Sequence, residues 1–148
     1  MAAVLAGWIL WPRPAATPQA RQYLDVSACL LTDSRGVVPG AAGASVWASM
    51  ERASRATHVM LTYLPATAPA NVPVLLNTLV QRRCGVIITS SAAPIQVAQA
   101  AQANPGHQFL AVTSARSSLP MPVNASVVSA SAANSRIDQA LSALAAAA

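Results

Sequence analysis

Charged side chains are scarce in this 148-residue chain, in which only 9% of the residues are Asp, Glu, Lys or Arg. Soluble domains usually carry about 25%. There is no lysine, and nine arginines outnumber four acidic residues. Four acids in the whole chain argue against an enzyme that relies on a pair of catalytic carboxylates.

Aromatic side chains are also few, at 4% of the residues, although the formal net charge is +5. A nucleic-acid surface combines clustered basic residues with rings on which bases stack. Here the arginines are dispersed, and only Arg82 and Arg83 are adjacent. We therefore expect no nucleic-acid partner, and we attribute the positive charge to the shortage of acids.

The motifs of common enzyme classes are absent. The chain contains no GxGxxG, GxxxxGK[ST] or GxSxG sequence. Two cysteines and the distant His58 and His107, which we expect in surface loops, do not supply a set of metal ligands. The sequence thus predicts a protein that is not an enzyme and that uses no cofactor or metal.

An apolar run with two tryptophans, residues 2–11, opens the chain. It is shorter than the roughly 20 residues that a membrane-spanning helix needs, and no basic region precedes it as in a secretory signal. We interpret residues 1–12 as the end of a membrane anchor or a signal-like segment, and residues 13–25 as a tether. Both interpretations place the domain outside the cytoplasm, and the anchor, which we favour, holds it at the membrane. The alternative is an apolar tail packed on the domain.

Strand and helix patterns alternate along residues 26–148, a length that suits one domain. Apolar runs predict strands at residues 26–32, 58–64, 85–89, 109–113 and 125–129. Helical periodicity predicts helices at residues 43–55, 72–83, 94–103 and from 135 onward. We therefore expect a doubly wound, mainly parallel α/β sheet with the strand order 2-1-3-4-5.

Two helix ends carry more specific expectations. Arg82 and Arg83 are predicted in the last turn of the second helix, where cations complement the helix dipole. Asn134 is predicted to cap the last helix. Both assignments give these polar residues structural roles rather than functional ones.

Parallel sheets of this kind bind ligands at the carboxyl ends of their strands. The residues predicted there are small, and all but one are uncharged: Asp33, Ser34, Ser90, Ser91 and Thr113. These five are the candidate ligand-binding residues, and Asp33 is the strongest of them. The alternative is that Asp33 hydrogen-bonds its own turn and that the hydroxyls cap turns and helices.

The two cysteines fall in neighbouring strands of the expected sheet. Cys29 lies in the first predicted strand and Cys84 at the entrance to the third, so their sulfurs can approach. Two cysteines in an exported domain suggest one disulfide. Two buried free thiols are the alternative.

Three segments carry a family resemblance: Thr32-Asp33-Ser34-Arg35-Gly36 with Trp47 after it, residues 84–92, and residues 108–113. They stand at the T-D-x-G-G, C-D-L-I-V-G-x-G-F and K-F-A-I-V-D segments of the basic membrane protein family. Residues 28–144 thus resemble the amino-terminal lobe of that family's extracytoplasmic substrate-binding proteins of ABC transporters, several of which bind purine nucleosides. The resemblance implies a lobe like those of periplasmic binding proteins, with a small polar ligand.

Departures from the family pattern fall on its ligand contacts. The S-F-N element stands at Ala41-Ala42-Gly43, the phenylalanine after the third strand is Ala92, and the acid closing the fourth is Thr113. Only Asp33 persists, and the family closes two lobes on its ligand where this chain has one. We therefore expect a structural or interaction module in an envelope assembly, with a protein partner or a second copy. The alternative is the substrate-binding component of an ABC transporter for a nucleoside-like or other small polar solute.

Overall fold

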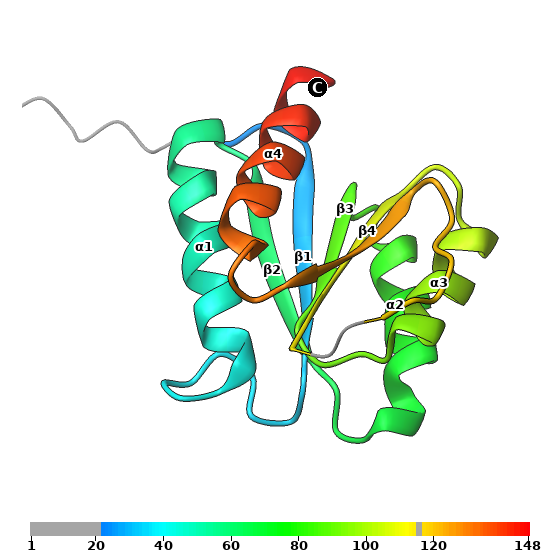
Figure 1. Ribbon diagram of the computed structural model, residues 1–148. Coiled ribbons are helices and arrows are strands. Elements are labelled where there is room, and N and C mark those ends of the chain that lie inside the picture. Colours follow the sequence, from blue (N-terminus) through cyan, green and yellow to red (C-terminus); the bar gives the residue numbers. More distant parts are fainter. Residues whose placement is uncertain (1–21, 115–116) are drawn as a thin grey trace, which may run out of the picture.

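Strands and helices alternate along residues 22–114 and 117–148, the residues that the computed structural model describes (Figure 1). The strands are β1 (Ser27–Thr32), β2 (Met60–Pro65), β3 (Val86–Thr89), β4 (Gln108–Thr113) and β5 (Ala125–Ser129). The α-helices are α1 (Ala42–Thr57), α2 (Val72–Gln81), α3 (Pro94–Ala103) and α4 (Ala133–Ala146), and a short 3₁₀ helix, η1 (Pro69–Asn71), precedes α2. Every predicted strand and helix is present, with small shifts at the ends.

The strands form one parallel sheet in the order β2-β1-β3-β4-β5, which confirms the predicted topology. β1 lies between β2 and β3, with Ser27 opposite Met60 of β2 and Ala28 opposite Val86 of β3. β4 pairs with β3 on one side and with β5 on the other. Because every pair is parallel, all strands end at the same border of the sheet, which we name the carboxyl edge.

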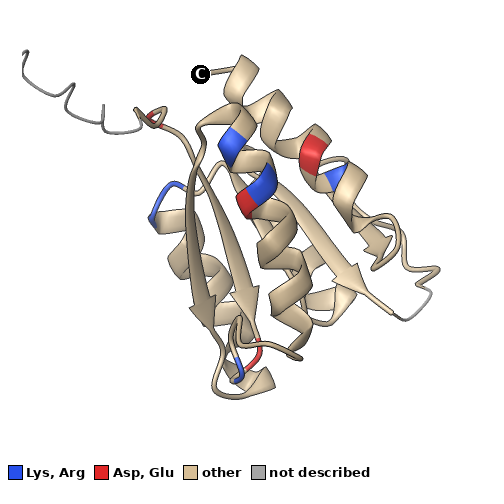
Figure 2. Cartoon of the chain, turned by 90° about the vertical axis from the view of Figure 1, so that its left-hand side faces the viewer, with Lys and Arg blue, Asp and Glu red and all other residues tan. Residues whose placement is uncertain are grey.

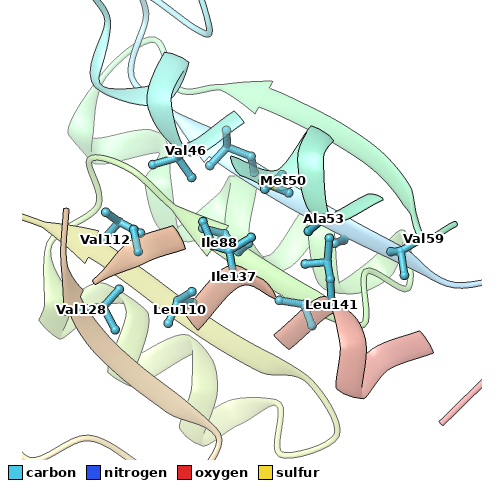
Figure 3. Packing of buried hydrophobic residues seen from close by; sticks show 14 residues of the cluster. Val46, Met50, Ala53, Val59, Ile88, Leu110, Val112, Val128, Ile137 and Leu141 are labelled. Carbon is cyan, nitrogen blue, oxygen red and sulfur yellow. The ribbon is translucent and has the colours of Figure 1, made fainter. Parts of the chain in front are cut away.

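Helices cover both faces of the sheet, with α1 and α4 packed together on one face and α2 and α3 on the other (Figure 1). The first face buries a cluster that includes Val46, Met50, Ile88, Ile137 and Leu141 (Figure 3). The second face buries a cluster that includes Leu76, Leu79, Ile87, Val97 and Phe109. Burial of one such side chain contributes about 1.5–3 kcal/mol, so these two clusters hold the three layers together.

Position in the sheet explains the composition of the strands. All four residues of β3 are buried, as are the last five of β1. Strands covered on both faces have nearly continuous apolar sequences. β2 is an edge strand, and its burial differs from that of β1 and β3. Its exposed residues are Met60, Thr62, Tyr63 and Pro65.

Two predicted helix ends were wrong. α2 ends at Gln81, so Arg82 and Arg83 follow the helix rather than forming its last turn. Arg83 adopts a φ of 60°, which turns the chain out of the helix and toward β3. α4 begins at Ala133, and its N-cap is Ala132 rather than Asn134.

The apolar pattern predicted that the second strand begins at His58, but β2 begins at Met60. His58 is the left-handed C-cap of α1, with a φ of 60°, and its N–H donates to the carbonyl oxygen of Ser54 at 2.8 Å. The carbonyl oxygen of His58 in turn accepts from the N–H of Leu24 at 2.8 Å. The folded body therefore already includes Leu24, two residues before the predicted boundary.

The predicted anchor, residues 1–12, and residues 13–21 of the predicted tether lie outside the described residues. Within residues 22–114 and 117–148, no helix has both the length and the apolar character needed to cross a bilayer.

Candidate functional site

The candidate ligand-binding residues follow three adjacent strands at the carboxyl edge. Asp33 and Ser34 come after β1, Ser90 and Ser91 come after β3, and Thr113 ends β4. The N–H of Ser90 donates to the carbonyl oxygen of Leu31 at 3.0 Å, which holds the end of β3 beside the end of β1. The sequence therefore located this border of the sheet correctly.

The structure divides these residues between two open hollows on opposite faces of the sheet. Asp33, Ser34 and Ser91 line a hollow of about 410 Å³ whose other walls come from η1, α2 and α3. Ser90 and Thr113 line a hollow of about 310 Å³ whose other walls come from α1 and α4. Because successive residues along an extended chain point to opposite faces of the sheet, Ser90 faces one hollow and Ser91 faces the other. The five candidate residues do not converge on one ligand position.

Asp33 is hydrogen-bonded within its own turn. Its Oδ1 accepts from the N–H of Arg35 at 3.0 Å, and its carbonyl oxygen accepts from the N–H of Gly36 at 3.1 Å. Gly36 has a φ of +64°, a conformation that glycine adopts without strain. This is the turn-stabilising role of an aspartate, which one of the two interpretations of the sequence had assigned to it.

The hydroxyl of Ser49 and the amide of Asn134 join the two helices that wall the smaller hollow. The hydroxyl of Ser49 in α1 is hydrogen-bonded to the carbonyl oxygen of Ser45 at 3.0 Å and to Oδ1 of Asn134 in α4. Methyl groups of Ala130 and Ala133 line the same hollow. The hydrogen bond between Ser49 and Asn134 thus serves helix packing, and no sequence pattern indicated it.

Charge is sparse at the candidate site. Figure 2 shows charged residues on α1, on α4 and in a few loops, while the strands carry none. The ion pair between Arg52 and Asp138, at 3.5 Å, joins α1 to α4 with both side chains about half exposed. Exposed pairs of this kind contribute about 0–1 kcal/mol. No cluster of three or more His, Cys, Asp or Glu side chains that could hold a metal occurs in the described part of the chain.

Cys29 and Cys84 form a disulfide in the structure, with their Cα atoms 5.8 Å apart. The bond joins the middle of β1 to a residue two positions before β3, and both cysteines are almost fully buried, at 2% and 1% exposure. The two alternatives left open by the sequence are thus resolved in favour of the disulfide. It lies in the core beneath α2 and α3, away from the carboxyl edge.

Two polar residues outside the candidate site hold the loop before β4. His107, predicted in a surface loop, is half-buried, and its Nδ1 lies 2.8 Å from the carbonyl oxygen of Cys84. The buried Asn124 donates through Nδ2 to the carbonyl oxygens of Ala101, Asn104 and His107, at 3.0, 3.1 and 2.9 Å. Sequence reasoning missed this role of Asn124, because an asparagine between a loop and a strand ordinarily indicates only a turn.

Solved structures of the same fold include solute-binding proteins, a lipoprotein fragment and a 3-dehydroquinate dehydratase-like protein. A fragment titled "putative lipoprotein" from Peptoclostridium difficile 630 is 17% identical, with a TM-score of 0.62, over 78% of this chain and 93% of that one. A solute-binding protein of an ABC transporter system from Conexibacter woesei DSM 14684 is 15% identical, with a TM-score of 0.60, over 70% of this chain and 35% of that one. Another from Aeropyrum pernix K1 is 12% identical, with a TM-score of 0.56, over 68% of this chain and 28% of that one.

These likenesses show the fold: the chain is built like one lobe of a solute-binding protein. It spans about a third of the length of the two solute-binding proteins. No model of a protein family matches the sequence, and no curated protein sequence matches it.

Proposed function

We propose that this chain is an extracytoplasmic domain that is held at the membrane by residues 1–12 and that acts through contacts with other proteins. It is not an enzyme, and it uses no cofactor. The contact surface is the carboxyl edge, where two-lobed solute-binding proteins close on their ligand. The observation that carries this proposal is the division of the candidate residues between two hollows.

A small-molecule site buries most of its ligand and aims several polar groups at it. At the carboxyl edge, three of the candidate residues face one hollow and two face the other. The only carboxylate among them already accepts a hydrogen bond from its own turn. Such an edge is better suited to broad contact with a protein than to enclosing a metabolite.

The disulfide supports a place outside the cytoplasm, because disulfides form and persist in oxidising compartments. The names of three structural neighbours point the same way, since they describe a lipoprotein and ABC-transporter solute-binding proteins. The apolar run at residues 2–11 supplies a segment for membrane attachment.

The resemblance to the basic membrane protein family supports descent from a solute-binding lobe. In the structure the matching segments occupy the turn after β1, the stretch around β3 and the whole of β4. Those are three adjacent strands, so the resemblance covers the centre of the sheet rather than scattered loops.

A second candidate function is binding of a small polar solute, and the hollow at Asp33 favours it. That hollow, at about 410 Å³, lies within the roughly 300–1,000 Å³ typical of ligand pockets, and it contains Ser34, Ser91 and Gln96 beside Asp33. A second lobe or a second copy would have to close over it.

Thermal unfolding of the full chain with a panel of purine and pyrimidine nucleosides separates the two candidates. A ligand at about 100 times its dissociation constant stabilises the folded state by about 2.7 kcal/mol. We expect no shift in the unfolding temperature with any nucleoside. A saturable shift that disappears in Asp33→Ala would support solute binding instead.

Protein contact at the carboxyl edge is tested by a photo-crosslinking amino acid placed at Ser91. Gln102, exposed near the other end of α3, is the matched control position. In the producing cell we expect a protein adduct from position 91 and none from position 102. Equal adducts at both positions, or none at either, would contradict the proposed surface.

Membrane attachment is tested separately with phospholipid vesicles. The full chain should sediment with them, and a chain that lacks residues 1–12 should remain in the supernatant.

A further inference from the structure

The outer edge of β2 is an apolar strip. Eight large apolar side chains of the described residues are exposed. Met60 and Tyr63, at 39% and 43% exposure, belong to β2 itself. Tyr23, at 49% exposure, precedes Leu24, whose N–H is hydrogen-bonded to His58 just before β2. Val38, at 53% exposure, lies two residues after Gly36, and Gly36 is next to the ring of Tyr63. Half of the exposed large apolar side chains therefore lie along or beside one strand.

The backbone of β2 also has unused hydrogen-bonding groups. Met60 and Ala66 donate their N–H groups to Val26 and Thr32, on the side of β1. Alternate residues of a parallel strand bond to the same neighbour, so the N–H and C=O groups of Leu61 and Tyr63 point outward. No strand pairs with that side of β2 among the described residues, because β2 is an edge strand of the sheet.

Natural proteins protect such edges with charge, proline, bulges or a covering element. Here the sequence contains no charged residue between Arg55 and Arg82, and Pro65 stands only at the end of β2. The opposite edge strand, β5, is better protected, since Ser129 is its only exposed residue. The two borders of the same sheet thus differ, and only β2 offers an open, uncharged, apolar edge.

From this geometry we infer that two copies of the chain pair through β2 in an antiparallel, two-fold symmetric manner, which joins two sheets into one. An uncharged edge fits a partner edge that is equally uncharged, and a second copy supplies one. With Thr62 opposite Thr62 of the second copy, Leu61 of each chain faces Tyr63 of the other. All the outward N–H and C=O groups of these residues are then bonded, and the pairing closes after two copies.

The side chains are compatible with this register. Leu61 and Tyr63 face the α1 side of the sheet, where the ring of Tyr63 meets Trp47 edge-to-face at a centroid distance of 5.3 Å. In the dimer, this ring would lie beside Leu61 of the second copy, and aromatic–aliphatic pairs across strands stabilise a sheet. This surface is distinct from the carboxyl edge, so the inference goes beyond the proposed function and each can fail without the other.

Light scattering of the full chain after size exclusion tests the inference. A mild detergent is included, so that copies of the chain do not associate through the apolar run at residues 2–11. We expect a protein mass twice the 15.1 kDa of one chain. Thr62→Arg places two like charges opposite each other on the symmetry axis and should halve the mass. Val123→Arg adds the same charge at a fully exposed position beside the other border and should leave it unchanged.

A cross-link keeps the test decisive if Thr62→Arg fails to fold. Residues opposite each other in a non-hydrogen-bonded antiparallel pair have Cα atoms about 4.5 Å apart, within the range that a disulfide spans. Thr62→Cys should therefore form a covalent dimer under mild oxidation, and Val123→Cys should not. A monomeric wild-type chain, or equal cross-linking of the two cysteine variants, would overturn the inference.

Discussion

The Cys29–Cys84 disulfide closes a loop with a sequence separation of 55 residues, through β1, α1, β2 and α2. In the chain-entropy model, a cross-link over a loop of that length stabilises the folded state by about 4 kcal/mol at 25 °C. Domains of this size are stable by only about 5–15 kcal/mol in total. Replacing both cysteines by alanine should therefore remove a large part of the free energy of unfolding.

Guanidinium unfolding of the full chain, followed by circular dichroism, measures this loss. The double variant Cys29→Ala/Cys84→Ala should unfold at a much lower denaturant concentration than the wild-type chain. Its denaturant dependence should be steeper, because an unfolded chain without the cross-link exposes more surface. Reduced wild-type protein should behave like the double variant.

Addition of a reductant supplies the control. It should destabilise the wild-type chain and leave the double variant unaffected. Because both cysteines are nearly inaccessible, reduction of the native protein should also proceed no faster than its unfolding. Equal midpoints for oxidised wild type, reduced wild type and the double variant would refute the assignment of this bond as a major source of stability.

Substitutions at Asn124 and Thr89 test buried polar groups by urea unfolding. Asn124→Ala should lower the free energy of unfolding by about 1–3 kcal/mol, because the carbonyl oxygens of Ala101, Asn104 and His107 lose their shared donor. Asn124→Asp should lower it further, because a carboxylate then lies among those oxygens. The opposite order would contradict the role of Asn124 as their donor. The buried Thr89 hydroxyl has no hydrogen-bond partner among the residues that the structure describes, so Thr89→Val should be neutral or stabilise the fold by about 1 kcal/mol. Thr32→Val is the matched control, and it should destabilise, since the Thr32 hydroxyl donates to the carbonyl oxygen of Asp33; equal effects of the two valines would refute the distinction.

Sheet topology could be predicted because burial has a simple signature in sequence. β1 and β3 are covered on both faces, so their sequences are apolar throughout. The apolar residues Val72, Leu76 and Leu79 recur at helical spacing, and these three are the buried residues of α2. The right-handed crossover rule then leaves few strand orders for such a series of elements.

Helix ends were harder to predict, because they depend on single backbone conformations. Arg83 and His58 both adopt left-handed φ values that no apolar pattern announces. Asparagine is a preferred N-cap residue, yet the side chain of Asn134 is hydrogen-bonded to Ser49 of α1, a residue 85 positions away. Local preference favoured one role, and a tertiary contact gave the residue another.

By itself, the sequence determined the layers, the strand order and the border of the sheet where a site would lie. Only the tertiary structure decided that Ser90 and Ser91 face different hollows, that Cys29 and Cys84 are joined, and that Asn134 bonds to Ser49. The physical reason is one of range. Burial patterns repeat every two or four residues and can be read along the chain, whereas the face, the partner and the neighbour of a side chain are set by segments that meet only when the chain folds.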